Sequence, residues 1–153
     1  MDEVRVATAT GTVGRVVAAR IRPGTDFITA IEQICADKGI QSAWVNCIGS
    51  LQNCDYFILE RKDNVLGAGY GEAHNCAYPV ELLSASGLIV EGTVHLHGTI
   101  CSDDGKVVGG HIIKGTAKSL ATIEIFITEI CGANMVRAYD PECEANHFAP
   151  TER

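Results

Sequence analysis

Three histidines flank a tight turn in the second half of the chain, and this pattern constrains the fold more than any other. His95 and His97 are two residues apart, and because side chains on a strand alternate between faces, both rings would point to one side of a sheet. His111 follows the polar segment 102–106, which suits a three-residue hairpin loop with Gly105 in the left-handed conformation. The pattern predicts an antiparallel hairpin with all three histidines on one face.

The register of this hairpin decides whether the three rings can meet. If Ser102 pairs with Lys106, counting back along both strands places His97 directly opposite His111. His95 then lies on the diagonal, at roughly 7 Å from His111, which is close enough for long side chains to converge. A loop of two residues instead of three would shift the register by one and turn His111 to the other face.

Three converging imidazoles predict a metal site formed by His95, His97 and His111. Imidazole nitrogen suits zinc, copper, nickel and iron, and availability as much as geometry favours zinc. Three protein ligands leave one tetrahedral position open for water or a substrate oxygen. An open site of this kind can polarise a carbonyl or lower the pKa of bound water. We therefore expect a small oxyanion as ligand. The alternative is that the three rings form hydrogen bonds on a half-buried face and hold no ion.

Catalysis at such a site would need further polar groups. Glu81 is a carboxylate candidate for proton transfer, and Arg20 is a candidate for holding an anionic substrate by a bidentate contact. Glu91 and Glu124 are further carboxylates. The alternative for Glu81 and Arg20 is an ion pair between strands or subunits. The sequence leaves open whether the site turns a ligand over or only senses it.

Five short motifs run in order through residues 12–130. They are Arg20-Ile21-Arg22-Pro23-Gly24 with Asp26, Ile48-Gly49-Ser50, Glu81-Leu82-Leu83-Ser84 with Gly87, His95-Leu96-His97, and Asp104-Gly105 followed by Gly109-Gly110-His111. With them the chain resembles prokaryotic single-domain members of the PPC (plants and prokaryotes conserved) family, also known as DUF296. The resemblance implies an α+β fold, with a twisted antiparallel sheet packed with one or two helices, zinc on the three histidines, and assembly as a homotrimer.

The hairpin also resembles the metal-binding half of α-acetolactate decarboxylase. There an HxH pair and a later GGH histidine hold zinc that polarises a carbonyl of a small keto-hydroxy acid. The resemblance stops at the hairpin, because this chain is shorter and its third histidine is set back by a longer turn. It implies zinc and an oxygen ligand, but not that reaction.

DNA binding is the competing interpretation, because plant PPC proteins are DNA-associated regulators. Those proteins contact the groove through a separate AT-hook, and the printed sequence contains no such segment. Twelve basic against nineteen acidic residues give a net charge of −7, which disfavours contact with phosphates. A local basic patch is the remaining route, and its candidates are Arg15, Arg20, Arg22, Arg61 and Lys62.

Composition indicates one globular domain over residues 1–153, with a core at about 12–130 and a C-terminal extension at 131–153. No apolar run approaches the roughly eighteen residues that span a bilayer, and the first residues lack the pattern of a signal peptide. We expect a cytoplasmic protein without membrane contact. Seven cysteines without a CxxC pair predict free thiols, with Cys47 and Cys131 in the core.

Hydrophobic periodicity predicts one clear helix and seven strands. The helix would begin after Thr25 or Asp26, either of which can act as its N-cap, and end at Gly39. Two weaker groups of histidine and cysteine, residues 74–76 and 143–147, are expected in surface loops. The polar tail beyond residue 140 is expected to lie on the surface or against a neighbouring molecule. Strands are expected at residues 12–22, 42–48, 56–61, 82–90, 93–101, 107–113 and 120–130.

Overall fold

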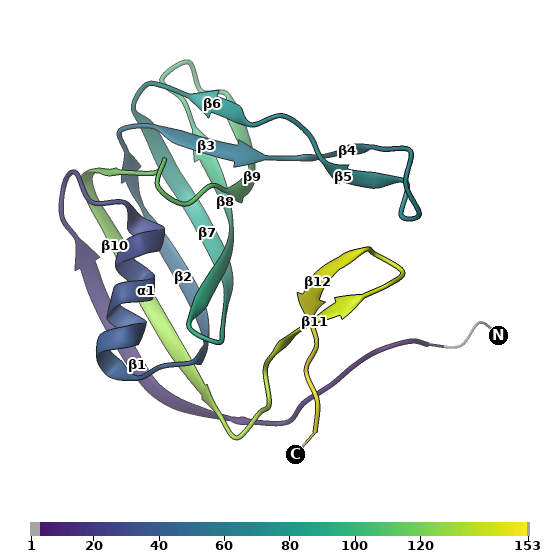
Figure 1. Ribbon diagram of the computed structural model, residues 1–153. Helices are drawn as coiled ribbons and strands as arrows, with labels where there is room; N and C mark the ends of the chain where they lie inside the picture. The colour runs from purple at the N-terminus through teal and green to yellow at the C-terminus, as the bar shows by residue number, and fades with distance from the viewer. Residues whose placement is uncertain (1–3, 153) are drawn as a thin grey trace.

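The computed structural model describes residues 4–152, and one eight-stranded antiparallel sheet dominates it (Figure 1). The strand order across this sheet is β1-β10-β2-β7-β8-β9-β3-β6. Its strands are β1 (Thr12–Ile21), β2 (Ser42–Leu51), β3 (Cys54–Phe57), β6 (His74–Cys76), β7 (Val80–Val90), β8 (Thr93–Cys101), β9 (Val107–Ile112) and β10 (Ser119–Cys131). This architecture is the α+β fold with a twisted antiparallel sheet that the family resemblance implies.

Helix α1 (Phe27–Lys38), the one helix in the described part of the chain, packs on one face of the sheet. Asp26 caps its N-terminus, since Oδ1 accepts hydrogen bonds from the Thr29 backbone N–H at 2.9 Å and from the Thr29 hydroxyl at 2.7 Å. Gly39 ends it in the left-handed conformation, with φ of 66°. Both predicted ends of the helix are confirmed. Its buried side chains are Phe27, Ile28, Ile31 and Cys35.

Among residues 4–152, no helix covers the other face of the sheet (Figure 1). In β2 the side chains of Ala43 and Val45 are buried on the helix side, whereas Trp44 and Ile48 are exposed on the opposite side. Burial therefore separates an apolar core under α1 from an open outer face. For brevity we call this outer face the helix-free face.

One row of residues crosses the helix-free face through the ladder registers. Phe126 lies opposite Asn46, Asn46 opposite Ser86, Ser86 opposite His97, and His97 opposite His111. Because directly opposed residues share a face, the histidines lie on the helix-free face. They are therefore on the side of the sheet that the helix does not cover.

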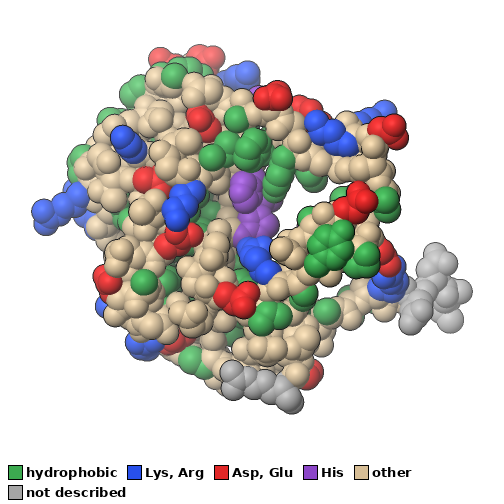
Figure 2. Space-filling view, in the orientation of Figure 1, with side chains coloured by type: hydrophobic (Ala, Val, Ile, Leu, Met, Phe, Trp, Pro, Cys, Tyr) green, Lys and Arg blue, Asp and Glu red, His purple; other side chains and the backbone are tan. Residues whose placement is uncertain are grey.

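Two small hairpins project beyond the sheet (Figure 1). The first, β4 (Leu59–Arg61) with β5 (Ala68–Tyr70), follows β3. The second, β11 (Arg137–Asp140) with β12 (Ala145–Phe148), follows β10, and we call it the C-terminal hairpin. Both hairpins extend past the part of the sheet that holds the histidines (Figure 2).

The structure corrects several sequence expectations. The strand expected at 56–61 is split into β3 and β4, since the chain leaves the main sheet at Ile58. Residues 74–76 form β6, and β12 includes most of the segment 143–147, although both were expected in loops. Cys131 is exposed because it is the last residue of β10, whereas Cys47 is buried as expected. Within residues 4–152, no helix has the length and apolar character needed to cross a membrane.

Candidate metal centre

The β8–β9 hairpin has the predicted three-residue loop. The Ser102 N–H donates to the Lys106 carbonyl at 3.0 Å, and the Gly105 N–H donates to the Ser102 carbonyl at 2.9 Å. Gly105 has φ of 78°, a conformation in which any side chain would be strained. The resulting register places His97 opposite His111, which confirms the alignment on which the sequence argument depends.

The three histidine rings converge at one point. The ring centroids lie 5.1 Å apart for His95 and His97, 4.9 Å for His95 and His111, and 5.5 Å for His97 and His111. One ligand nitrogen of each ring lies within 4.8 Å of the others. Nε2 of His95 and Nε2 of His97 are 3.2 Å apart. Two nitrogens on one tetrahedral zinc, each at about 2.0–2.1 Å from the ion, lie about 3.3 Å apart, so this pair already has the required spacing.

Close approach of the backbones brings the rings together. A Cβ added to Gly87 would lie 2.1 Å from the carbonyl oxygen of His95, and one added to Gly110 would lie 2.1 Å from that of Phe57. Real side chains cannot tolerate such distances. Glycine at these two positions therefore lets β7 and β3 pack tightly against the strands that carry the histidines.

The environment favours the neutral form of two of the imidazoles, those of His95 and His111. Burial lowers the pKa of His95 to about 4, with smaller contributions from His111, His97 and Arg137. Burial also lowers the pKa of His111, and the nearby His97 and Arg137 add to this effect. Neutral imidazole is the form that coordinates a metal, so these two rings are prepared for binding near neutral pH.

The donor set fits a divalent metal ion. Nδ1 of His111 is buried and has no hydrogen-bond partner among residues 4–152. A buried nitrogen without a partner is costly, and such an atom within a group of three imidazoles is one that a bound ion or water would satisfy. Three imidazole nitrogen donors suit zinc and its neighbours among the transition metals.

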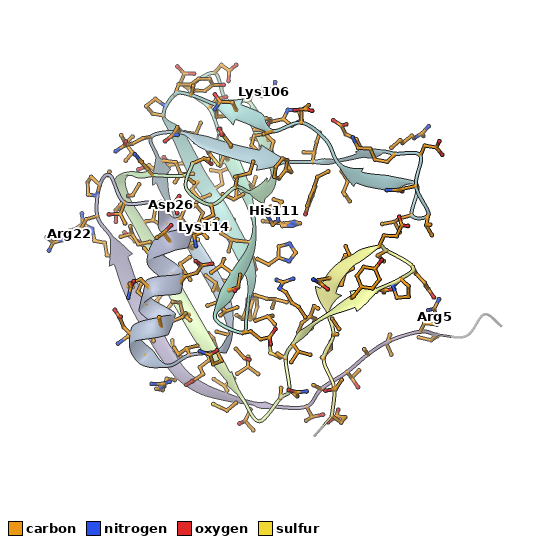
Figure 3. All side chains as sticks on the ribbon, viewed as in Figure 1. Arg5, Arg22, Asp26, Lys106, His111 and Lys114 are labelled. Carbon is orange, nitrogen blue, oxygen red and sulfur yellow. The ribbon has the colours of Figure 1, made fainter. Side chains whose placement is uncertain are left out.

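A cavity of about 540 Å³ opens over His95 and His111. The C-terminal hairpin forms one wall of this cavity, and Tyr70 of β5 contributes to another. Figure 2 shows histidine side chains at the bottom of the hollow between the two hairpins, and Figure 3 shows His111 facing it. The lining residues are Tyr70, Leu88, Thr93, Val94, His95, His111, Arg137, Ala145, Asn146, His147 and Phe148.

Arg137 is the functional candidate that sequence reasoning missed. Its side chain is half-buried in the cavity wall, and its positive charge helps to lower the pKa of His95 and His111. Its backbone N–H donates to Glu91 Oε2 at 3.2 Å, which fixes the start of β11 beside the end of β7. The C-terminal segment that contains Arg137 has no hydrophobic periodicity, so nothing in the sequence indicated that the chain returns to the histidines there.

The structure does not bring Arg20 or Glu81 to the histidines within one chain. Arg20 lies on β1, four strand spacings from β8 and thus roughly 19 Å away, and its Nε donates to Thr122 Oγ1 at 3.0 Å. Glu81 is exposed at the start of β7, five residues before Ser86, the residue that faces His97. At about 3.3 Å per residue this separation is roughly 17 Å along the strand.

The two further carboxylates also lie outside the cavity lining. Glu124 is opposite Arg20 on β10, and Glu91 accepts the hydrogen bond from the Arg137 backbone. None of the residues that line the cavity, within the described range 4–152, is an aspartate or a glutamate. The carboxylates selected from the sequence are therefore not part of the cavity wall.

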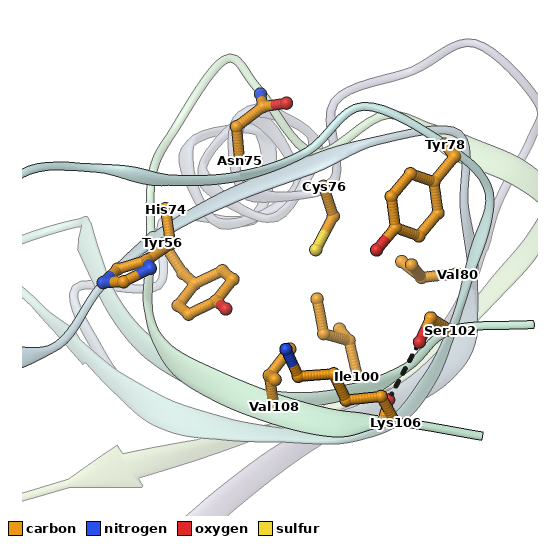
Figure 4. Close-up of a pocket in the computed structure, with 10 residues that line it drawn as sticks. All are labelled: Tyr56, His74, Asn75, Cys76, Tyr78, Val80, Ile100, Ser102, Lys106 and Val108. Carbon is orange, nitrogen blue, oxygen red and sulfur yellow. Dashed lines mark hydrogen bonds between the residues drawn. The ribbon is translucent and has the colours of Figure 1, made fainter. Parts of the chain in front are cut away.

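A second cavity, of about 190 Å³, lies where β3, β6, β7, β8 and β9 surround the end of the sheet. Tyr56, Cys76, Tyr78 and Lys106 point into it (Figure 4). Ile100 and Val108 contribute to its wall, and neither they nor the other lining residues belong to the histidine cluster. This cavity is separate from the candidate metal centre.

Comparison with known proteins identifies the family. The model of the Plants and Prokaryotes Conserved (PCC) domain matches residues 8–131. The chain belongs to this family. The PCC match includes all three histidines and the β8–β9 hairpin, and it ends before the C-terminal hairpin. The resemblance seen in the sequence motifs is thereby confirmed.

Several solved structures share the fold. A plant- and prokaryote-conserved protein from Pyrococcus horikoshii is 26% identical, with a TM-score of 0.77 over 92% of this chain and 96% of that one. A metal-containing protein from Archaeoglobus fulgidus is 24% identical, with a TM-score of 0.81 over 94% and 99% of the two chains. A protein from Ralstonia eutropha JMP134 with a provisional DNA-binding name is 25% identical, with a TM-score of 0.71 over 86% and 89%.

One curated relative contains a similar segment within a much longer chain. The bifunctional protein GlmU of Synechococcus sp. (strain JA-3-3Ab) is 26% identical over 128 residues, or 83% of this chain. The match spans about a fifth of that protein's length, since it covers 19% of it. The similar segment is thus one part of a larger protein.

Proposed function

We propose that this PCC-domain protein binds one zinc ion through His95, His97 and His111, and that the open fourth position of the ion takes an oxygen of a small oxyanion. The observation that carries the proposal is the convergence of three imidazole nitrogens within 4.8 Å beside a cavity. The lowered pKa of His95 and of His111, together with the unpartnered Nδ1 of His111, supports metal coordination. The metal content of the Archaeoglobus fulgidus relative agrees with it.

The bound ion would supply Lewis acidity toward the ligand oxygen. The chain's own residues would position the ligand, with Tyr70 and Asn146 offering polar groups at the cavity wall. The described cavity lining contains no carboxylate that could act as a general base. Outside the metal cluster, its titratable residues are Tyr70, Arg137 and His147. Ligand binding or sensing is therefore favoured over carboxylate-assisted turnover.

We further propose that the protein is a homotrimer. The helix-free face exposes large apolar side chains in neighbouring strands, with exposed fractions of 51% for Trp44, 53% for Ile48 and 58% for Phe126. A contiguous apolar patch on a soluble domain is typical of an interface, and a closed ring of identical subunits would cover it. We also propose a cytoplasmic location, because all seven cysteines are free.

DNA binding is the second candidate, and the name of the Ralstonia eutropha relative favours it. The basic residues that could form a patch are divided between β1 and the β4–β5 hairpin, which lie at opposite ends of the fold (Figure 1). Arg15 is paired with Glu129, and Lys62 with Glu60. With a net charge of −7, this arrangement supports small-anion binding better than binding to duplex DNA.

The metal content of the purified protein tests the proposal. Protein prepared without chelator and measured by elemental analysis should contain about one equivalent of zinc or a similar ion per chain, because the ligands are preformed. His97→Ala should lose most of it, whereas His74→Ala should keep it, since His74 is an exposed histidine outside the cluster. Wild-type protein that remains empty in micromolar zinc would contradict the proposal.

A further inference from the structure

Arg137 lines the same cavity as His95 and His111, and its guanidinium has no anionic partner among residues 4–152. The described ion pairs of the chain do not include it, and no side-chain hydrogen bond to a residue within 4–152 holds it. Glu91 Oε2 accepts a hydrogen bond from the backbone N–H of Arg137 and not from its side chain. Within the described part of the chain, no acidic side chain therefore neutralises the Arg137 charge at the cavity wall.

The positive charge of Arg137 beside a metal site favours the binding of an anion. Once a divalent ion occupies the three histidines, the cavity contains that ion and the Arg137 guanidinium, with no carboxylate among the described lining residues to balance them. Two cations that share one cavity repel each other, and an anion bound between them removes this repulsion. A carboxylate has the required geometry, since one oxygen can bind the ion while the group accepts paired hydrogen bonds from a guanidinium.

The rest of the cavity wall is mainly apolar. Leu88 faces His95 across the β7–β8 ladder, and Val94, Ala145 and Phe148 add aliphatic and aromatic surface. Phe148 also lies opposite Arg137 in the C-terminal hairpin, which places an apolar ring next to the free charge. A volume of about 540 Å³ accommodates more than a bare inorganic anion.

We infer that the ligand of this site is a small aliphatic monocarboxylic acid whose carboxylate bridges the metal ion and Arg137, while its hydrocarbon part packs against Leu88 and Phe148. The inference rests on the proposed metal-dependent function and names the ligand class and the residue that binds its charge. It also assigns ligand selection to the C-terminal hairpin, which lies beyond the residues that match the family model.

Cobalt(II) substitution provides a direct test, because its visible absorption reports changes in the ion's coordination. Titration of cobalt-loaded wild-type protein with butyrate should change the spectrum in a saturable way. Arg137→Ala should bind cobalt as the wild type does but bind butyrate at least about tenfold more weakly, since a charge-assisted hydrogen-bonded pair is lost. The butyrate affinity of Arg137→Lys should lie between those of the wild type and Arg137→Ala. Arg22→Ala, which makes an equal charge change on an exposed residue outside the cavity lining, should bind butyrate as tightly as the wild type.

A series of acids tests the apolar part of the inference. Affinity should rise from acetate to propionate to butyrate by up to about fourfold per added methylene, because each buries more hydrocarbon. Phe148→Ala should reduce this gain while leaving the affinity for acetate nearly unchanged. Inorganic phosphate that binds more tightly than butyrate would overturn the ligand class.

The outcomes separate this inference from the proposed function. If wild-type protein does not bind cobalt or zinc, the metal-site proposal fails. If cobalt binds normally but Arg137→Ala binds butyrate as tightly as the wild type, the metal site stands and the role of Arg137 is wrong. Retention of cobalt binding by Arg137→Ala also shows that the variant is folded.

Discussion

His97 lies directly opposite His111 in the β8–β9 ladder, and their ring centroids are 5.5 Å apart. Strands on both sides hold this pair, since β7 pairs with β8 through Ser86 and His97, and β3 pairs with β9 through Phe57 and His111. A flanked pair of strands cannot slip without breaking two ladders at once. The relationship between the two rings is therefore a property of the whole sheet.

Acidification should destabilise the metal-free protein through His95. Its pKa is lowered by burial to about 4 in the folded state, from an ordinary value of 6.5, so between these values the unfolded chain binds more protons. The free energy of unfolding should fall by about 1–2 kcal/mol as the pH drops through this window, after allowance for partial solvent screening. Urea denaturation at pH 7 and pH 4.5 measures the change.

The variant His95→Gln provides the control for this pH effect. It removes the titrating ring while keeping a polar side chain of similar length, so its stability should depend less on pH over the same window. Equal losses in the wild type and in His95→Gln would show that His95 is not the group responsible.

Oligomeric mass tests the helix-free face as an interface. Multi-angle light scattering at micromolar concentration should return about three times the 16.3 kDa mass of one chain. Phe126→Asp should lower this mass, because it places a charge in the centre of the apolar patch, whereas Leu66→Asp on the β4–β5 hairpin should not. A monomeric wild type would disprove the trimer.

Asp26 should contribute more to stability than an ordinary helix cap. Oδ1 caps α1, while Oδ2 accepts from the backbone N–H groups of Gly115 at 3.0 Å and Ala117 at 3.2 Å. Asp26→Ala should lower the free energy of unfolding by about 2–3 kcal/mol, since several N–H groups lose their acceptor. Asp37→Ala, on the exposed side of the same helix, should cost less than about 1 kcal/mol in chemical denaturation.

Duplex DNA should bind weakly if at all. We expect dissociation constants no better than about 10⁻⁴ to 10⁻⁶ M at physiological salt, measured by fluorescence anisotropy with a labelled duplex, because phosphate contacts must overcome the acidic surface. Any residual binding should decline steeply with salt and persist in His95→Ala. Tight binding that survives loss of the histidines would favour the regulatory function instead.

The chain's local chemistry determined the hairpin that brings the three histidines together. Alternation placed His95 and His97 on one face, and the turn residues ending in Gly105 set the register that brought His111 opposite. The ends of the helix were equally readable, because Asp26 and Gly39 act through atoms only a few residues away. These features depend on short-range geometry, which a sequence expresses directly.

Only the tertiary structure decided what surrounds the histidines. Arg137 reaches the cavity through a contact with Glu91, 46 residues earlier in the chain, and no periodicity in a short polar tail predicts such a return. The same holds for Arg20 and Glu81, whose distance from the histidines follows from the order of the strands in the sheet. Strand order and hairpin placement depend on packing between distant segments, and so local patterns in the sequence do not record them.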